Sequence, residues 1–319
     1  MVKYILKRIL QSVLVLFILS IFAFALINAA PGEPAAAIYG GQLDKLTQTE
    51  KARINENLGL NKPVVTRYGY WLKQVSKGEL GYSYRTGRSV NEMIRNRMPN
   101  TLRLFLVSFN LTAFLAIIIG LFAGMHPDTG IDRGITVVSI VTNGIPSVLV
   151  AILLVFIFSA KLGWLPSSGC ESLFDTGAGR GKYMILPVIT IILSHVGAFS
   201  RFIQEGLKDE LGSYYVTVAK ANQVSPSKLK WGAMKNALVP FVNYAGTHIP
   251  SFFSGFVVIE VVFSYPGLGN MIYSAIPVKD YPLLMGGILV TGVVVVISML
   301  MIDLIDLALN PRLRKAVVK

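Results

Sequence analysis

A glycine-rich segment near the middle of the sequence, Gly177-Ala178-Gly179-Arg180-Gly181-Lys182-Tyr183, has the composition of a loop that could hold phosphate. A phosphate-binding loop needs glycine, four further residues, then Gly-Lys followed by serine or threonine, whose hydroxyl ligates magnesium. Thr176 stands where the first glycine is needed, and Tyr183 stands where serine or threonine is needed. Both ends of the motif fail, so we interpret the segment as a flexible loop and expect no ATP or magnesium on this chain.

The three histidines, His126, His195 and His248, are the next residues whose chemistry matters. They are scattered along the sequence, whereas a zinc-hydrolase helix needs two histidines four residues apart. The single cysteine, Cys170, excludes an intrachain disulfide framework and a cysteine-based metal site. We therefore expect no metal site and no catalytic residue. His195 and His248 fall in apolar runs, where they could face a water-filled pathway or make hydrogen-bonded packing contacts between helices.

Glu260, Asp303 and Asp306 are acidic residues within or beside strongly apolar runs. An ionisable side chain inside a membrane is costly and usually faces the protein interior or an aqueous cavity. Glu260 is therefore a candidate to line a pathway or an external gate, as are His248 and His195. Asp303 and Asp306 precede a basic C-terminal segment, and we expect them to pair with its arginines and lysines.

The elements that carry these residues are expected to be membrane spans, because the composition does not suit a soluble domain. The 319 residues are 53% hydrophobic and 15% charged, with a mean hydropathy of +0.58. Soluble domains carry about 25% charged residues. The formal net charge is +13. Basic residues mostly flank the apolar runs and do not alternate with aromatic residues, so lipid headgroups and not nucleic acid are the expected partner.

Six apolar runs are long enough to cross a bilayer, which takes about 20 residues. They fall within residues 9–30, 104–125, 134–160, 183–200, 237–265 and 281–302. The first run exceeds the roughly 7–15 apolar residues of a signal peptide, so we expect it to be retained. Asn143-Gly144-Ile145-Pro146 interrupts the third run and predicts a kink that faces other helices. Residues 267–280 are expected to be a connector rich in glycine and proline.

Basic residues also predict the orientation of the chain. Lys3, Lys7 and Arg8 precede the first span and place the N-terminus in the cytoplasm. Six spans return the C-terminus to the same side, in agreement with its basic tail and with the basic stretch at residues 201–235. The predicted fold is all-α, a multi-pass protein of the cell membrane. Its parts are residues 1–30 (cytoplasmic N-terminus and first span), 31–100 (extracytoplasmic, with amphipathic pieces at 44–58 and 63–77) and 101–319 (a five-helix core with a cytoplasmic loop at 205–236).

The polar stretch between the fourth and fifth spans has the pattern of two helices separated by a break. Residues 209–221 favour a helix, and Asp209 and Glu210 suit its N-terminus. Asn222 is expected to end this helix in a left-handed conformation. Ser225-Pro226 then predicts a second short helix over residues 226–236. A basic loop lying on lipid headgroups is the alternative, but the two-helix pattern favours a docking surface for a partner in the aqueous phase.

Tyr215-Val216-Thr217-Val218-Ala219-Lys220-Ala221, followed by residues 235–240, resembles the cytoplasmic "EAA" loop of permeases from binding-protein-dependent ABC importers. The resemblance extends to the oligopeptide and dipeptide permeases of that group. It rests on further matches, in the family's order, at residues 78–90, 98–102, 258–269, 280–282 and 310–312. The EAA pattern alone is only moderately specific, whereas the ordered set covers nearly the whole chain. Two departures stand out: Thr217 replaces the glutamate, and Asn222-Gln223 replaces the usual glycine.

The resemblance implies the transmembrane-domain fold of a type I ABC importer with six transmembrane helices, and a subunit that is not an enzyme. It implies several partners: a second homologous permease subunit, two cytoplasmic ATPase subunits that bind ATP and magnesium, and an extracytoplasmic substrate-binding protein. The loop would provide a coupling helix seated in a cleft of an ATPase subunit. The docking candidates on this loop are Tyr214, Tyr215, Val218, Ala219, Lys220, Asn222 and Gln223. Candidates for contact with the binding protein are Tyr82, Tyr84, Arg85 and Arg88.

The function expected from the resemblance is ATP-driven import of oligopeptides or dipeptides, with this chain forming half of the translocation pathway. The alternative is the same architecture importing nickel, a metal chelate or glutathione. A secondary transporter would be expected to show inverted repeats with broken helices, and six spans with one coupling loop fit that poorly. An intramembrane hydrolase would need paired catalytic residues within the spans, and none align.

Overall fold

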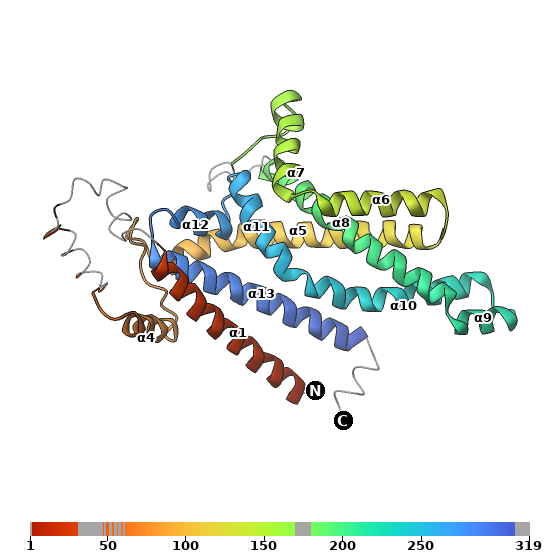
Figure 1. The fold of residues 1–319 in the computed structure, drawn as a ribbon, viewed down its shortest axis with the longest axis horizontal. Coiled ribbons are helices and arrows are strands. Elements are labelled where there is room, and N and C mark those ends of the chain that lie inside the picture. The colour runs from red at the N-terminus through yellow and green to blue at the C-terminus, as the bar shows by residue number, and fades with distance from the viewer. Residues whose placement is uncertain are drawn as a thin grey trace. The chain divides into compact units, whose positions relative to one another are not determined.

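The computed structural model describes residues 2–30, 61–169 and 180–309, together with residues 47, 49–50, 53, 56 and 59. The ordered elements of this part are helices, apart from an isolated antiparallel bridge between Tyr82 and Ser89 (Figure 1). The chain divides into two compact units. Of the described residues, unit 1 contains 103–169, 180–265 and 297–309, and unit 2 contains 2–30, 61–102 and 266–296. The predicted all-α class is confirmed.

Unit 1 is built around one long helix, α8. Its elements are the C-terminal part of α5 (Val90–Gly124), α6 (Gly130–Gly144), α7 (Ser147–Leu154), a π-helical turn (Val155–Lys161), α8 (Arg180–Gly212), α9 (Tyr214–Ala221), α10 (Pro226–Thr247), α11 (Ile249–Val262) and the C-terminal part of α13 (Tyr281–Leu309). Helix α8 packs against α6, α7, α10 and α11. The end of the glycine-rich segment at residues 177–183 forms the first turn of α8, and residues 177–179 lie outside the described residues.

Small residues let the helices of unit 1 approach α8 closely. A Cβ atom at Gly120 of α5 would lie 2.5 Å from the Ser200 carbonyl oxygen, and one at Gly124 would lie 2.9 Å from the Gln204 carbonyl oxygen. On α8 itself, a Cβ at Gly197 would lie 2.9 Å from the Ser139 carbonyl oxygen. Helix association within a membrane depends on such backbone proximity, because lipid supplies no hydrophobic drive. These glycines fix α8 between α5 and α6.

The described residues contain four helices long and apolar enough to cross a membrane: Ile5–Ala29, Val90–Gly124, Gly181–Gly212 and Tyr281–Ala308. Two bent pairs raise the number to as many as six if each pair is one span. Helices α6 and α7 meet at 97°, and α10 and α11 meet at 49°. The first bend falls at the predicted interruption, residues 143–146. These four residues are exposed on the described chain, so they do not face other helices of this chain as predicted.

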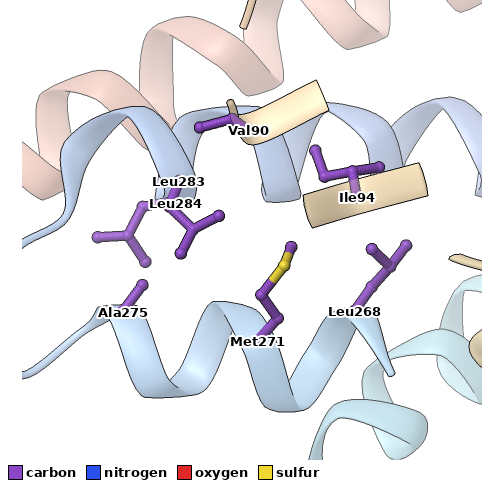
Figure 2. Packing of buried hydrophobic residues seen from close by; sticks show 7 residues of the cluster. All are labelled: Val90, Ile94, Leu268, Met271, Ala275, Leu283 and Leu284. Atoms are coloured by element: carbon purple, nitrogen blue, oxygen red, sulfur yellow. The ribbon is translucent and has the colours of Figure 1, made fainter. Parts of the chain in front are cut away.

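Unit 2 contains α1 (Val2–Ala29), α4 (Val64–Val75), the N-terminal part of α5, α12 (Leu268–Ala275) and the N-terminal part of α13 (Tyr281–Leu309). Figure 2 shows its core, where side chains of α12 meet those of α5 and α13. The residues of this core are Val90, Ile94, Leu268, Met271, Ala275, Leu283 and Leu284. The prediction of a plain connector over residues 267–280 is wrong, because apolar residues at helical spacing bury one face of α12.

Helix α4 packs against α1, as the amphipathic pattern at residues 63–77 predicts. Trp71 joins Ala23 of α1 and Met285 of α13 in a second buried cluster. The hydroxyl groups of Tyr68 and Ser20 lie 2.8 Å apart, which fixes α4 along the second half of α1. The amphipathic piece predicted at residues 44–58 lies largely outside the described residues.

Candidate functional site

The loop between α8 and α10 contains a short helix of its own, with boundaries that differ from the prediction. Helix α8 continues to Gly212, Ser213 is extended at φ −69° and ψ 154°, and α9 begins at Tyr214. The prediction of one helix over residues 209–221 is therefore wrong, and Asp209 and Glu210 lie in the last turn of α8. Gly-Ser is the sequence signal for this break, since glycine weakens a helix and serine suits the residue before one.

The second helix of the loop is also longer than predicted. Helix α10 begins at Pro226 after Ser225, as expected, but it continues to Thr247 instead of ending at residue 236. The side chain of Ser225 makes no capping hydrogen bond. The coupling-loop segment, defined here as residues 205–236, is thus the end of α8, all of α9 and the start of α10. Two of its three helical pieces continue directly into membrane spans.

Helix α9 ends in a Schellman motif centred on Gln223. The Val224 amide donates to the Ala219 carbonyl oxygen, and the Gln223 amide donates to the Lys220 carbonyl oxygen, each at 3.0 Å. This pair of bonds places the left-handed residue at Gln223. Gln223 has φ 55°, whereas Asn222 has φ −83° and ψ 16°. The prediction that Asn222 takes the left-handed conformation is wrong by one position, while the predicted helix break is present.

The outer face of α9 carries apolar and aromatic side chains without cover from the described chain. Tyr214 is 83% exposed, Tyr215 is 43% exposed and Val218 is 40% exposed. Val216, by contrast, is 1% exposed and holds the opposite face of the helix against the protein. The other predicted docking residues are Ala219, which is half-buried, and the exposed Lys220, Asn222 and Gln223. The predicted docking set therefore lies on one short helix and on the two residues that follow it.

Trp231 is an exposed aromatic residue of the same loop that the sequence reasoning did not select. It lies in α10, is 59% exposed, and its ring centroid is 5.1 Å from the Lys235 ammonium. The sequence feature that could have identified it is a tryptophan in a polar, basic stretch, because large aromatic residues are enriched where one protein binds another.

A polar cluster ties α9 to both flanking helices. The Tyr215 hydroxyl donates to Glu210 Oε2 at 2.7 Å, and Asn236 Nδ2 donates to the same oxygen at 3.1 Å. Asn236 Nδ2 also lies 3.3 Å from the Tyr215 hydroxyl. Burial raises the pKa of Tyr215, and its bond to Glu210 raises it further, so the phenol is a donor at neutral pH. The cluster joins the end of α8, the start of α9 and the middle of the loop's second helix.

An ion pair connects the end of α8 to the start of α6. Lys208 Nζ lies 2.6 Å from Asp132 Oδ1 and 2.8 Å from Oδ2, and Asp132 is 5% exposed. The side-chain amide of Gln204 completes the site, because its Nε2 donates to Asp132 Oδ1 and to the Thr136 hydroxyl. The Asp128 amide donates to Asp132 Oδ2 at 3.1 Å. No role was predicted for Asp132 from the sequence.

The two candidate pathway histidines lie on one aromatic cluster of unit 1. The His195 ring centroid is 3.9 Å from that of Phe252, and the His248 ring centroid is 5.6 Å from that of Phe199. Phe199 and Phe252 are themselves 5.7 Å apart. Each imidazole Nδ1 also lies within 3.0 Å of the carbonyl oxygen four residues earlier on its helix. Each histidine therefore makes its hydrogen bond within its own helix and packs its ring against a phenylalanine of another helix.

The acidic residues Glu260 and Asp306 are both buried, in α11 and in α13. Glu260 is fully buried near the C-terminal end of α11, so it does not line an open surface of the described chain. Asp306 is 7% exposed in α13. The basic tail expected to pair with Asp303 and Asp306 begins at residue 310, outside the described residues. Within the described part, no group of three histidine, cysteine or acidic side chains could hold a metal ion.

The four residues proposed to contact a binding protein lie in a hairpin of unit 2 held by Asp280. The Asp280 carboxylate accepts from the Ser83 hydroxyl at 2.5 Å, the Tyr84 amide at 3.0 Å and the Arg85 amide at 3.4 Å. Tyr82, Arg85 and Arg88 are exposed. Tyr84 is instead half-buried, with its ring centroid 6.3 Å from that of Tyr281. Three of the four candidates are therefore available at the surface.

Comparison with known proteins gives matches over almost the whole chain. Residues 116–315 match the family model described as "binding-protein-dependent transport system inner membrane component", and residues 1–105 match the model of its N-terminal region. The chain is similar to the oligopeptide transport system permease protein AppB of Bacillus subtilis, at 32% identity over 98% of this chain and 99% of that protein.

Two further relatives are named for different transported substrates. A putative peptide transport system permease protein of Brucella abortus is 33% identical over 98% of this chain and 99% of that protein. The metal-staphylopine import system permease protein CntB of Staphylococcus aureus is 32% identical over 99% of each chain.

Proposed function

Because the chain belongs to the family of binding-protein-dependent transport system inner membrane components, we propose that it is the permease subunit of an ATP-driven importer of oligopeptides or dipeptides. The observation that carries this proposal is the exposed outer face of α9. Tyr214, Tyr215 and Val218 lie uncovered on a helix whose base is held to α8 and α10. Exposed aromatic and apolar side chains on a fixed helix suit a protein partner.

In this proposal the chain forms half of a translocation pathway and carries out no covalent chemistry. A second homologous permease subunit forms the other half. Two cytoplasmic ATPase subunits bind ATP and magnesium, and one of them receives α9 in a surface cleft. An extracytoplasmic binding protein delivers the substrate and contacts Tyr82, Arg85 and Arg88. The chain lies in the cell membrane with both termini in the cytoplasm.

The contacts around α9 explain how movement of an ATPase subunit would reach the spans. The bonds of Glu210 to Tyr215 and Asn236 make α9 move with the end of α8. Helix α8 is continuous from Arg180 to Gly212, so its cytoplasmic end cannot move without the span above it. The ion pair between Lys208 and Asp132 extends the same movement to α6. This pattern supports the proposal that the loop transmits movement to the spans.

Glu260, His195 and His248 are proposed to act within the pathway region. All three are covered or half-covered in the described chain. Their role is therefore to set the positions of α8, α10 and α11 and the properties of an external gate. An ionisable residue within a span is a functional candidate because its burial is costly.

The relatives favour a peptide substrate, with the metal-staphylopine permease as support for the alternative of nickel, a metal chelate or glutathione. The test is uptake by a strain that lacks this chain, with and without the restored gene. Labelled dipeptides, longer peptides, nickel and glutathione are supplied separately. Restored uptake of peptides alone is expected. Restored uptake of nickel or glutathione, with no effect on any peptide, would replace the peptide assignment with the alternative.

A further inference from the structure

A pocket in unit 2 has features that the transport proposal does not use. It has a volume of about 310 Å³ and lies among α1, α4, α13 and the hairpin that precedes α5. The residues that matter to its chemistry are Phe24, Lys62, Arg67, Tyr84, Tyr281 and Met285. This volume is at the lower end of the range of small-molecule sites, roughly 300–1,000 Å³. The pocket can hold a polar headgroup but not a long chain.

The described lining of this pocket is basic, and the Asp280 carboxylate beside it, which acts on Tyr84, accepts from the Ser83 hydroxyl and from the Tyr84 and Arg85 amides. Lys62 and Arg67 line it, and no aspartate or glutamate is among its described lining residues. The Arg67 guanidinium carbon lies 5.7 Å from the Tyr281 ring centroid and 5.9 Å from that of Phe24. Within the described part of the chain, no acidic side chain forms an ion pair with Arg67 or Lys62. A guanidinium placed against two rings keeps its planar donors for an anionic ligand.

The pocket lies where membrane spans end, so a ligand in it would lie at the membrane surface and not in the hydrocarbon core. Phe24 is in the last turns of α1, which ends at Ala29, and Tyr281 begins α13. Aromatic residues at span ends mark the membrane–water interface, where lipid headgroups lie. The bond between Tyr68 and Ser20 holds α4 nine residues before the end of α1, or about 13 Å along that helix.

Helix α4 has the surface of a helix that lies on a bilayer. Val64 is 48% exposed, Val65 is 82% exposed and Leu72 is 36% exposed, while Trp71 is buried against α1. Apolar residues exposed beside basic ones are typical of an interfacial helix. The pocket therefore opens beside a surface suited to lipid.

Resting on the cytoplasmic N-terminus of the proposed function, which places the end of α1 outside, we propose that this pocket binds the phosphate of an outer-leaflet phospholipid headgroup, with the Arg67 guanidinium as its principal donor. Lys62 adds a second positive charge, and the Tyr84 hydroxyl is a neutral donor. Burial raises the pKa of Tyr84, which keeps its phenol protonated. The site would anchor α4 and the neighbouring hairpin to the membrane surface. This inference does not depend on which substrate the transporter carries.

Trp71 lines the pocket and provides a local probe. In a Trp164→Phe/Trp231→Phe background, the fluorescence of the remaining tryptophan is followed during titration of the delipidated, detergent-purified protein with dihexanoyl phosphatidylglycerol. A saturable change is expected. Arg67→Ala should weaken the apparent affinity at least tenfold. Lys73→Ala is the matched control, because Lys73 is an exposed residue of the same helix and does not line the pocket.

Two further arms keep the test decisive. Arg67→Lys retains the charge but loses the planar pair of donors, so its affinity should fall between those of the Arg67 protein and Arg67→Ala. If Arg67→Ala does not fold, Arg67→Lys takes its place in the comparison. Inorganic phosphate and glycerol 3-phosphate are titrated in the same way. Equal affinity of the Arg67 variants and the Lys73 control would overturn the site. If inorganic phosphate or glycerol 3-phosphate saturates the fluorescence change at the same concentration as the lipid, the assignment to a lipid is wrong.

Discussion

Lys208 and Asp132 are 76 positions apart in the sequence, yet the Lys208 ammonium lies 2.6 Å from the Asp132 carboxylate. The pair joins the C-terminal end of α8, just before α9, to the first turn of α6. Asp132 is nearly buried, while the Lys208 side chain is 31% exposed. A single contact thus joins α6 to the part of α8 that leads into the candidate coupling helix.

Asp132→Asn should lower the stability of the protein by about 2 kcal/mol. Loss of one member of a fully buried pair costs roughly 3–5 kcal/mol, and the partial exposure of Lys208 reduces this. Asp132→Asn/Lys208→Met should cost less than the single change, because no ammonium is then left unpaired. The midpoint of thermal unfolding in detergent gives the order of the variants.

The control for this prediction is the exposed pair between Arg201 and Glu205 on the same helix, where the side chains are 43% and 57% exposed. Glu205→Gln should change stability by less than about 1 kcal/mol. A midpoint for Asp132→Asn equal to that of Glu205→Gln would show that the Lys208–Asp132 contact does not stabilise the protein.

Ala219→Arg should abolish both substrate uptake and association with the ATPase subunit. A long charged side chain on this half-buried alanine would separate α9 from a surface that fits it closely. Uptake and co-purification are measured at matched amounts of protein in the membrane. Ala219→Ser, which adds only a hydroxyl, should keep most of both. Uptake by Ala219→Arg at the unsubstituted level would remove α9 from the docking site.

Gln223→Gly should stabilise the loop by about 1 kcal/mol, because a side chain in the left-handed region costs roughly 1–2 kcal/mol that glycine avoids. Asn222→Gly should give no gain, since Asn222 has a negative φ. Limited proteolysis of the loop compares the two variants. Greater protection from Asn222→Gly than from Gln223→Gly would place the left-handed residue at 222 after all.

Much of the fold follows from patterns that are local in the sequence. Apolar runs about as long as a bilayer is thick predicted the spans, and Asn143-Gly144-Ile145-Pro146 predicted the break that bends α6 from α7 by 97°. The resemblance of residues 215–221 to a coupling loop selected Tyr214, Tyr215 and Val218, and the structure places all three at the surface, while their role in docking stays a prediction. Each of these features depends on residues within a few turns of one another.

The missed features depend on distant or competing contacts. Nothing near Asp132 in the sequence indicates Lys208, since helix packing alone brings them together. Asn is more often left-handed than Gln, so Asn222 was the better local choice. The bond from Val224 to Ala219 instead closes the helix one residue later. Helix α12 was missed because its buried face needs α5 and α13 to cover it.

Glu260→Gln should reduce uptake by tenfold or more without loss of protein from the membrane. The substitution keeps the shape of a fully buried side chain and removes its ability to ionise. Val258→Ala, a change at an exposed position of the same helix, is the control. Unchanged uptake together with unchanged basal ATPase activity in Glu260→Gln would exclude the proposed gate role.

The most direct test of the central proposal is ATP hydrolysis by the assembled transporter. The permease is purified from its own cells, reconstituted in nanodiscs with the proteins that co-purify, and assayed with and without binding protein and peptide. An ATPase should co-purify, and the binding protein with peptide should stimulate it several-fold, with no stimulation in Ala219→Arg. A chain that purifies without an ATPase, or an ATPase indifferent to binding protein and peptide, would contradict the proposal.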